Sequence, residues 1–331
     1  MLRHWLWRNL LQVVAGILLV AAASWLMTYA ADRKKEADVP PGWLMIRSPG
    51  NLHTVIRYNG EIWAGGVNGL FRFDAAAAAS LPLPQGAGSI AVVHDLLVDR
   101  SGRLWVGHEQ GASLYNGSGW EPYLSLPEKK QQPVTALLQD RDGAVWMGLS
   151  RGVYCSGDGQ GQFFPLNMGH VDVLYQDAQG RIWAGSSDPR QGGLACFDGS
   201  RWQAYGTKDG LVHPSVTTVM ETRDGTLWIG TGFGHVGGAN YFAADGAAGS
   251  MTRKDGLAGD KVRQIYEDKA GYIWFCSEND GVAVFKDGKR VALLTTASGL
   301  AGQEVKKIIQ DDSGVYWLAT EQGLSRIATL F

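Results

Sequence analysis

Short apolar stretches alternate with polar turns along most of this chain, and one nine-residue pattern returns repeatedly. The segment "DRDGAVWMG" at Asp140–Gly148 is polar for four residues and then apolar, with a tryptophan three residues after a glycine. Because its copies recur about every 42 residues, the pattern indicates a repeat architecture. The tryptophans of the seven copies are Trp63, Trp105, Trp146, Trp183, Trp228, Trp274 and Trp317.

Each copy predicts four short β-strands. The first is apolar, as in Val93–Asp99, and a D-x-x-G turn follows, whose glycine supplies the positive φ of a tight hairpin. The tryptophan strand is second, the third opens at a glycine, as in Gly69–Phe73, and the fourth carries aromatic residues, as in Trp202–Tyr205. Four short strands in roughly 40–45 residues are typical of a propeller blade. The sequence therefore predicts an all-β fold, a seven-bladed β-propeller over residues 42–331.

The last repeat lacks a fourth strand, which predicts how the ring closes. The chain ends at Gly323–Phe331, which has the pattern of a third strand. The segment Trp43–Arg47 resembles an outer strand and precedes the first repeat. We expect it to pair with the last blade, because closure removes the sheet edges that would otherwise promote aggregation.

The tryptophans and cysteines of the repeats read as core residues. Each repeated tryptophan shares a strand face with a small residue two positions later, which is glycine in five copies, Cys276 in the sixth and Ala319 in the seventh. A large side chain beside a small one lets neighbouring blades interleave. Cys155 and Cys196 occupy matching third-strand positions in adjacent blades, too far apart for a disulfide. We expect no disulfide and no cysteine ligand.

The N-terminal segment predicts a membrane anchor. Residues 10–31 form an uncharged, largely apolar run after Arg3 and Arg8. That length spans a bilayer, whereas a signal-peptide core is usually roughly 7–15 residues. We expect a cytoplasmic tail at 1–9, a transmembrane signal-anchor at 10–31, a linker at 32–41, and a propeller on the periplasmic side of a bacterial inner membrane. A cleaved signal peptide ending at "TYA" is the alternative. A net charge of −2 gives no footprint for nucleic acid.

The pattern V-x-x-[LI]-x-x-D-x-x-G-x-[LI]-W-[VIM]-G resembles the two-component regulator propeller repeats. The resemblance implies a ligand-binding sensor domain on the exported side of a bacterial signalling protein. Since the sequence ends at Phe331 without an output domain, we expect a signalling partner such as a histidine kinase. The segment Gly271–Glu278 also resembles virginiamycin B lyase-like propellers, which are described as using a histidine, a glutamate and magnesium. A propeller lyase or hydrolase is therefore one alternative, and an envelope scaffold protein is another. No catalytic motif, cofactor or metal site is identified.

The candidate ligand site lies on the propeller face opposite the uniform D-x-x-G turns. Loops on that face vary between repeats, and two adjacent repeats carry extended loops at Ser186–Gln191 and Thr231–Val236. The histidines after His4 also map to this face. Mixed acids and bases there suit a small polar ligand or a peptide, with Arg190 and Arg263 as anchors for a carboxylate or phosphate. The predicted mouth residues are His94, Asp95, His108, Asp172, Arg190, His213, His235, Arg263, Glu278 and Lys306.

Overall fold

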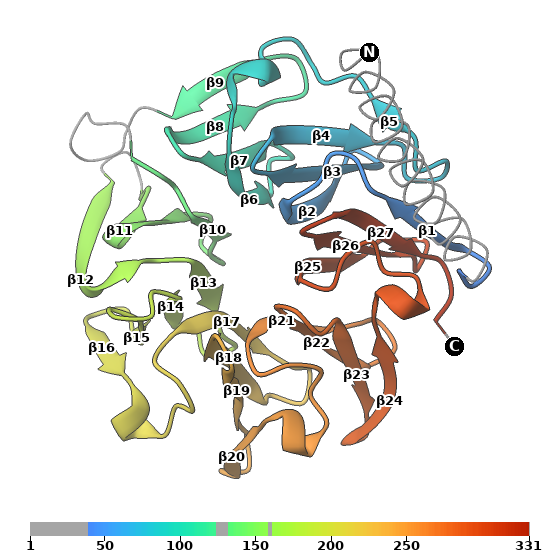
Figure 1. The fold of residues 1–331 in the computed structure, drawn as a ribbon. Coiled ribbons are helices and arrows are strands. Elements are labelled where there is room, and N and C mark those ends of the chain that lie inside the picture. Colours follow the sequence, from blue (N-terminus) through green and yellow to red (C-terminus); the bar gives the residue numbers. More distant parts are fainter. Residues whose placement is uncertain (1–38, 124–131, 158–160, 331) are drawn as a thin grey trace, which may run out of the picture.

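Seven small antiparallel sheets stand in a ring around a central channel (Figure 1). This computed structural model describes residues 39–123, 132–157 and 161–330, so the predicted signal-anchor at 10–31 lies outside the described residues. Within the described ranges, no helix has both the length and the apolar character needed to cross a bilayer. The predicted seven-bladed propeller is confirmed.

The blades follow one another along the chain, and each sheet runs from an inner strand at the channel to an outer strand. Blades 1 and 2 are β2 (Leu52–Tyr58), β3 (Glu61–Gly66), β4 (Gly69–Phe73), β5 (Ser80–Leu81), and β6 (Val93–Val98), β7 (Leu104–His108), β8 (Gly111–Tyr115), β9 (Trp120–Tyr123). Blades 3 and 4 are β10 (Ala136–Gln139), β11 (Val145–Cys155), β12 (Gln162–His170), and β13 (Val173–Gln176), β14 (Ile182–Ser186), β15 (Gly193–Phe197), β16 (Trp202–Tyr205). Blades 5 and 6 are β17 (Val216–Glu221), β18 (Leu227–Phe233), β19 (Val236–Phe242), β20 (Ala248–Met251), and β21 (Val262–Glu267), β22 (Ile273–Ser277), β23 (Val282–Lys286), β24 (Lys289–Leu294). Blade 7 is β25 (Val305–Gln310), β26 (Tyr316–Thr320), β27 (Gly323–Ile327) and β1 (Trp43–Ile46).

Short 3₁₀ turns connect several of these strands. They are η1 (Ala87–Ser89), η2 (Thr207–Asp209), η3 (Arg253–Asp255) and η4 (Thr296–Ser298). Blade 3 has three strands in place of the expected four, because the single strand β11 covers both the second and the third strand of the repeat. The turn inside it falls at Arg151, which has a φ of 62°.

The ring closes as predicted. Strand β1 pairs antiparallel with β27, with Trp43 opposite Ile327 and Ile46 opposite Leu324. The Trp43 indole also donates to the carbonyl of Thr329 at 2.9 Å. Figure 1 shows the two strands side by side although they come from opposite ends of the described chain. The closing strand ends at Ile46, one residue earlier than expected.

The D-x-x-G turn has a structural role, because its aspartate holds the turn and the tryptophan together. In blade 2, one oxygen of Asp99 accepts from the backbone N–H groups of Ser101 and Arg103, both at 2.9 Å. The other oxygen accepts from Trp105 Nε1 at 2.9 Å and from Arg103 Nε at 2.7 Å. Burial alone would raise the pKa of Asp99, but the Trp105 and Arg103 hydrogen bonds outweigh it and lower the pKa below 3.8.

The same carboxylate–indole bond recurs in four other blades and is missing in two. The recurring pairs are Asp140–Trp146, Asp177–Trp183, Asp268–Trp274 and Asp311–Trp317. Blades 1 and 5 carry Tyr58 and Thr222 where the aspartate would stand. There the buried Nε1 atoms of Trp63 and Trp228 find no hydrogen-bond partner among the described residues. Where the repeat lacks its aspartate, the tryptophan indole therefore loses its hydrogen-bond acceptor.

Small residues after the tryptophan let each blade approach the next. A side chain at Gly65 would meet Val93 of blade 2 at 2.2 Å, and one at Gly148 would meet the Val171 carbonyl of blade 4 at 2.1 Å. All seven repeated tryptophans are buried, as are Cys196 and Cys276. The predicted large-and-small alternation is therefore the geometry of the core.

Candidate functional site

In five of the seven blades, a local irregularity of the inner strand aims a side chain at the channel mouth. Five inner strands carry a β-bulge directly after their first residue, as between Val93 and Asp95 in β6 or between Val262 and Gln264 in β21. A bulge re-aims the residue that it leaves unpaired. In the repeat column that contains Val93, each blade has a buried Val or Leu as its first residue, and the second residue, which follows it, is polar in every blade. In blades 3 and 4 these two residues lie just before β10 and β13. We call these seven second residues the mouth ring: His53, His94, Thr135, Asp172, Thr217, Arg263 and Lys306.

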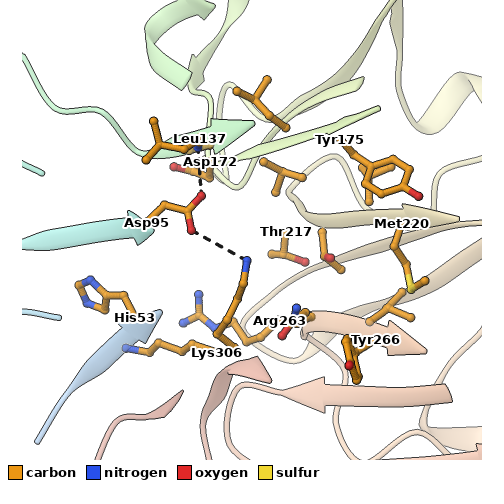
Figure 2. A pocket seen from close by; sticks show the side chains of 18 of the residues that line it. His53, Asp95, Leu137, Asp172, Tyr175, Thr217, Met220, Arg263, Tyr266 and Lys306 are labelled. Carbon is orange, nitrogen blue, oxygen red and sulfur yellow. Dashed lines mark hydrogen bonds and ion pairs between the residues drawn. The ribbon is translucent and has the colours of Figure 1, made fainter. Parts of the chain in front are cut away.

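The mouth ring encloses a cavity. Its seven members, together with Ser187 from the extended loop of blade 4, line a space of about 370 Å³. A second cavity of about 510 Å³ overlaps it and continues down the channel to Tyr175, Tyr266 and Glu267. Figure 2 shows labelled side chains from several blades pointing into this space. The cavity thus crosses much of the disc and is polar at its upper end.

The two cationic side chains of the mouth ring, Arg263 and Lys306, are already in contact with carboxylates. Arg263 Nη2 donates to Glu278 Oε1 at 2.6 Å and also to Glu304. Lys306 Nζ donates to Asn51 Oδ1 at 2.5 Å and lies 3.6 Å from Glu304 Oε2. Burial lowers the pKa of Lys306, although Glu304 acts in the opposite direction. This side of the mouth is therefore close to electrically neutral.

Two aspartates that line the cavity, Asp95 and Asp172, differ in how much of their carboxylate is free. Asp172 accepts from the backbone N–H and hydroxyl of Ser187, at 2.9 and 2.6 Å, through Oδ2 alone. Asp95 uses both oxygens: it accepts from Leu137 N at 3.0 Å, lies 3.9 Å from Lys307 Nζ, and accepts a long bond from Thr54. Because Lys307 belongs to blade 7 and Asp95 to blade 2, this ion pair reaches past blade 1. Asp172 is thus available to a ligand, while Asp95 mainly joins blades.

Two stacked imidazoles complete the ring. The rings of His53 and His94 lie 6.0 Å apart and are inclined by 8°. Nδ1 of His53 is 2.9 Å from the Val93 carbonyl, so Nδ1 carries the proton and Nε2 keeps its lone pair. Burial, followed by the charge of Lys306, lowers the pKa of His53 to about 4. His94 contacts Glu109 through Nε2 at 3.1 Å. Near neutral pH, His53 is therefore an uncharged hydrogen-bond acceptor.

Five of the ten predicted mouth residues line the cavity: His94, Asp95, Asp172, Arg263 and Lys306. The other five lie apart from that lining. Glu278 stands behind Arg263 and also accepts from Lys261 at 2.9 Å. His108 bonds Ser113 at 3.0 Å, and His213 accepts from Ser215 N at 3.1 Å. Arg190 and His235 are exposed on the extended loops. Of the two predicted anchors, Arg190 is thus misplaced and Arg263 is already paired.

The prediction missed three residues of the mouth ring: His53, Thr135 and Thr217. Their signal was in the sequence, since aligning the seven inner strands column by column isolates the polar second position. Neither charge nor residue type marks the two threonines of this column, which are defined only by their position in the repeat. The hydroxyl of Thr135 donates to the Val171 carbonyl at 2.7 Å, and that of Thr217 donates to the Val262 carbonyl.

The site has no arrangement typical of a metal centre. Across the described ranges, no group of three His, Cys, Asp or Glu side chains is placed to hold a metal ion. The cysteines are free thiols, and burial raises the pKa of Cys196 to about 11. The polar side chains at the mouth can offer hydrogen bonds and charge to a ligand.

Two of the repeats match a known family model. The model described as "Two component regulator propeller" matches residues 210–233 and 256–279, which include the tryptophan strands of blades 5 and 6. The chain carries two-component regulator propeller repeats. A search of curated proteins found no match.

Solved structures with the same fold include proteins of the bacterial cell surface. The extracellular domain of the hybrid two component system BT3049 from B. thetaiotaomicron superposes with a TM-score of 0.73 at 20% identity, over 87% of this chain and 41% of that one. PorZ, a surface component of the type-IX secretion system of Porphyromonas gingivalis, gives 0.63 at 15% identity, over 86% and 47%. An inactive virginiamycin B lyase from Staphylococcus aureus gives 0.65 at 13% identity, over 87% and 98%. These likenesses show the fold alone, and the chain spans less than half of the first two proteins.

Proposed function

We propose that this propeller is the ligand-binding part of a membrane-anchored, extracytoplasmic sensor, and that a small polar molecule or a peptide binds at the mouth ring. The observation that carries the proposal is the contrast between adjacent columns of the repeat. The repeat column that contains Val93 holds a buried Val or Leu in all seven blades, but the next column carries five different polar residue types. A column with only a packing role has no need for such variety.

The free hydrogen-bonding capacity of the ring indicates what it could bind. Acceptors outnumber donors, because Nε2 of His53 and Oδ1 of Asp172 are open and the threonine hydroxyls keep lone pairs. The Lys306 ammonium uses one bond to Asn51 and retains donor capacity. A ligand rich in N–H or O–H groups, with at least one acceptor, would match this set. Both peptides and polyhydroxylated small molecules meet that description.

The sequence and the likeness of the repeats support the proposed cellular role. The apolar run at 10–31 would anchor the propeller, and a histidine kinase or another membrane signalling protein would receive the signal. The family match and the fold shared with an extracellular domain of a two component system support this assignment. An enzymatic role has less support, because the likeness to the lyase is one of fold only.

A binding screen tests the proposal. The full chain in mild detergent is challenged with a panel of amino acids, di- and tripeptides, monosaccharides and disaccharides, and binding is measured by thermal shift and calorimetry. Lys306→Met and Asp172→Asn should each lower the affinity for the best compound by more than about tenfold, which is the effect of losing one good polar contact. The matched control Arg190→Ala, on an exposed loop outside the cavity, should bind normally. Equal affinity in all three variants would contradict the proposal.

A further inference from the structure

The junction between blades 4 and 5 lacks a packed side chain that the other six junctions possess, which we call the plug. At each of those six, a third-strand side chain of one blade shares a buried cluster with the repeated tryptophan of the preceding blade. The pairs are Phe73–Trp317, Tyr115–Trp63, Tyr154–Trp105, Phe197–Trp146, Phe285–Trp228 and Ile327–Trp274. The plug is an aromatic ring in five cases and a branched aliphatic chain in one.

Phe242 occupies the plug position of blade 5 but does not fill the junction. It pairs with the first residue of its tryptophan strand, as Phe73 and Phe285 do in their own blades. Those two side chains belong to residues that are 2% and 4% exposed, whereas Phe242 is 37% exposed. The cluster around Trp183 does not include Phe242. Phe242 instead lines the rim of a cavity that stands in place of the plug.

This junction cavity has a volume of about 270 Å³ and mostly apolar walls. Trp183 and Tyr205 lie with ring centroids 5.7 Å apart, and Leu194, Leu211 and Ile229 form the remainder of the inner wall. The charged groups at its edge are engaged: Arg181 donates to Asp177 at 2.6 Å, and Asp209 accepts from Gly206 N at 2.8 Å. An uncharged occupant therefore suits this cavity better than an ion.

The side-chain hydrogen bonds across this junction also differ from those across the neighbouring junctions. In blade 3, the residue after the turn aspartate is Arg141, which donates to the carbonyls of Asp177 and Ala178 in blade 4 at 2.8 and 2.9 Å. Arg100, Arg223 and Lys269 do the same for their own next blades. Blade 4 has Ala178 at this position, so its side chain makes no such clamp to blade 5. The junction with the empty plug position thus lacks this side-chain clamp, although the Ala178 N–H donates to Glu221 of blade 5 at 2.6 Å.

We propose that the blade 4–5 junction is a second binding site, independent of the mouth ring, for a small molecule with an uncharged aromatic ring. The chemistry of the occupant is given by the repeat, because five of the six equivalent places hold a phenyl or phenol ring against a tryptophan. Dry apolar cavities of about 150 Å³ accept benzene-sized molecules, so this cavity has room for one substituted ring. The ring would lie against Trp183, with Phe242 at the entrance.

The test uses 4-fluorophenol and indole as probes on the full chain in mild detergent, with binding followed by ¹⁹F NMR for the first and by thermal shift for both. Leu211→Phe places a ring inside the cavity and should weaken probe binding by more than about tenfold. Ile229→Phe fills the same space from blade 5 and serves if the first variant does not fold. Leu257→Phe is the matched control, because Leu257 holds the corresponding place at the plugged junction beside Phe285. It should lower the melting temperature and leave probe affinity unchanged.

Lys306→Met should also leave probe affinity unchanged, which separates this site from the mouth ring. The proposal is overturned if neither probe binds the wild type at millimolar concentration, or if both cavity-filling variants bind as the wild type does. It is also overturned if a crystal structure shows the Phe242 ring seated against Trp183, since the chain would then supply its own plug.

Discussion

Removing the Asp99 carboxylate tests whether the D-x-x-G turns hold the blades together. Its side chain is completely buried and accepts four hydrogen bonds, two from backbone N–H groups of the turn and two from Trp105 and Arg103. Asp99→Asn keeps one acceptor for the turn but presents an NH₂ group to the Trp105 indole. An unpaired buried N–H costs about 1–3 kcal/mol, so we expect the free energy of unfolding to fall by that amount.

Asp99→Ala should be more damaging than Asp99→Asn, because it removes every acceptor. Charge-assisted hydrogen bonds contribute about 1.5–3 kcal/mol each, and their contributions are not additive. The backbone N–H groups of the turn can also form hydrogen bonds with water once the carboxylate is gone. We therefore expect a loss of about 2–4 kcal/mol. Ser101→Ala is the matched control in the same turn, since the exposed Ser101 contributes through its backbone N–H, which alanine retains. It should change stability by less than about 0.5 kcal/mol.

Urea denaturation of the three variants, followed by circular dichroism, measures these differences at neutral pH. The expected order of midpoints is Ser101→Ala near wild type, then Asp99→Asn, then Asp99→Ala. The folded pKa of Asp99 lies below its usual 3.8, so its contribution is present above that pH and is lost as the pH falls through the folded value. Equal midpoints for Asp99→Ala and Ser101→Ala would refute the structural role of the turn aspartate.

Three further predictions concern the core, the closure and the histidines. Trp146→Ala should cost about 3–5 kcal/mol in urea denaturation, and Trp120→Ala on outer strand β9 clearly less, so equal losses would contradict the inner and outer strand assignment. A chain beginning at Leu52 lacks β1 and should aggregate in light scattering through the exposed edge of β27, whereas a monomer of unchanged melting temperature would show that closure is dispensable. His53 has a folded pKa of about 4 against 6.5 unfolded, so it lowers stability as the pH falls between those values, and His53→Gln should flatten the melting-temperature profile there relative to wild type.

The architecture could be predicted because it rests on local patterns repeated seven times. A turn aspartate, a tryptophan and a small residue at fixed spacing define each blade, and the missing fourth strand identified Trp43–Arg47 as the closing strand. The unbroken β11 was beyond prediction, because its course depends on Arg151 adopting a positive φ. The loss of the indole's partner beside Thr222 also needed the structure, since the sequence alone does not show which atom the aspartate contacts.

The site could be predicted only in part, because convergence at the channel depends on a backbone bulge. Of the predicted residues, His94, Asp172, Arg263 and Lys306 do come together around one cavity, as members of the mouth ring. Arg190 and His235 were misplaced because loop length shows where a chain extends and not whether it folds inward. The extended loop of blade 4 does reach the cavity, through Ser187 bound to Asp172 rather than through Arg190.

A crystal structure of the full chain with the best compound of the binding screen tests the central claim most directly. The account predicts ligand density inside the mouth ring, with a donor of the ligand bonded to Asp172 Oδ1 and an acceptor bonded to Lys306 Nζ. Density on the D-x-x-G face, with the mouth ring holding only water, would contradict it.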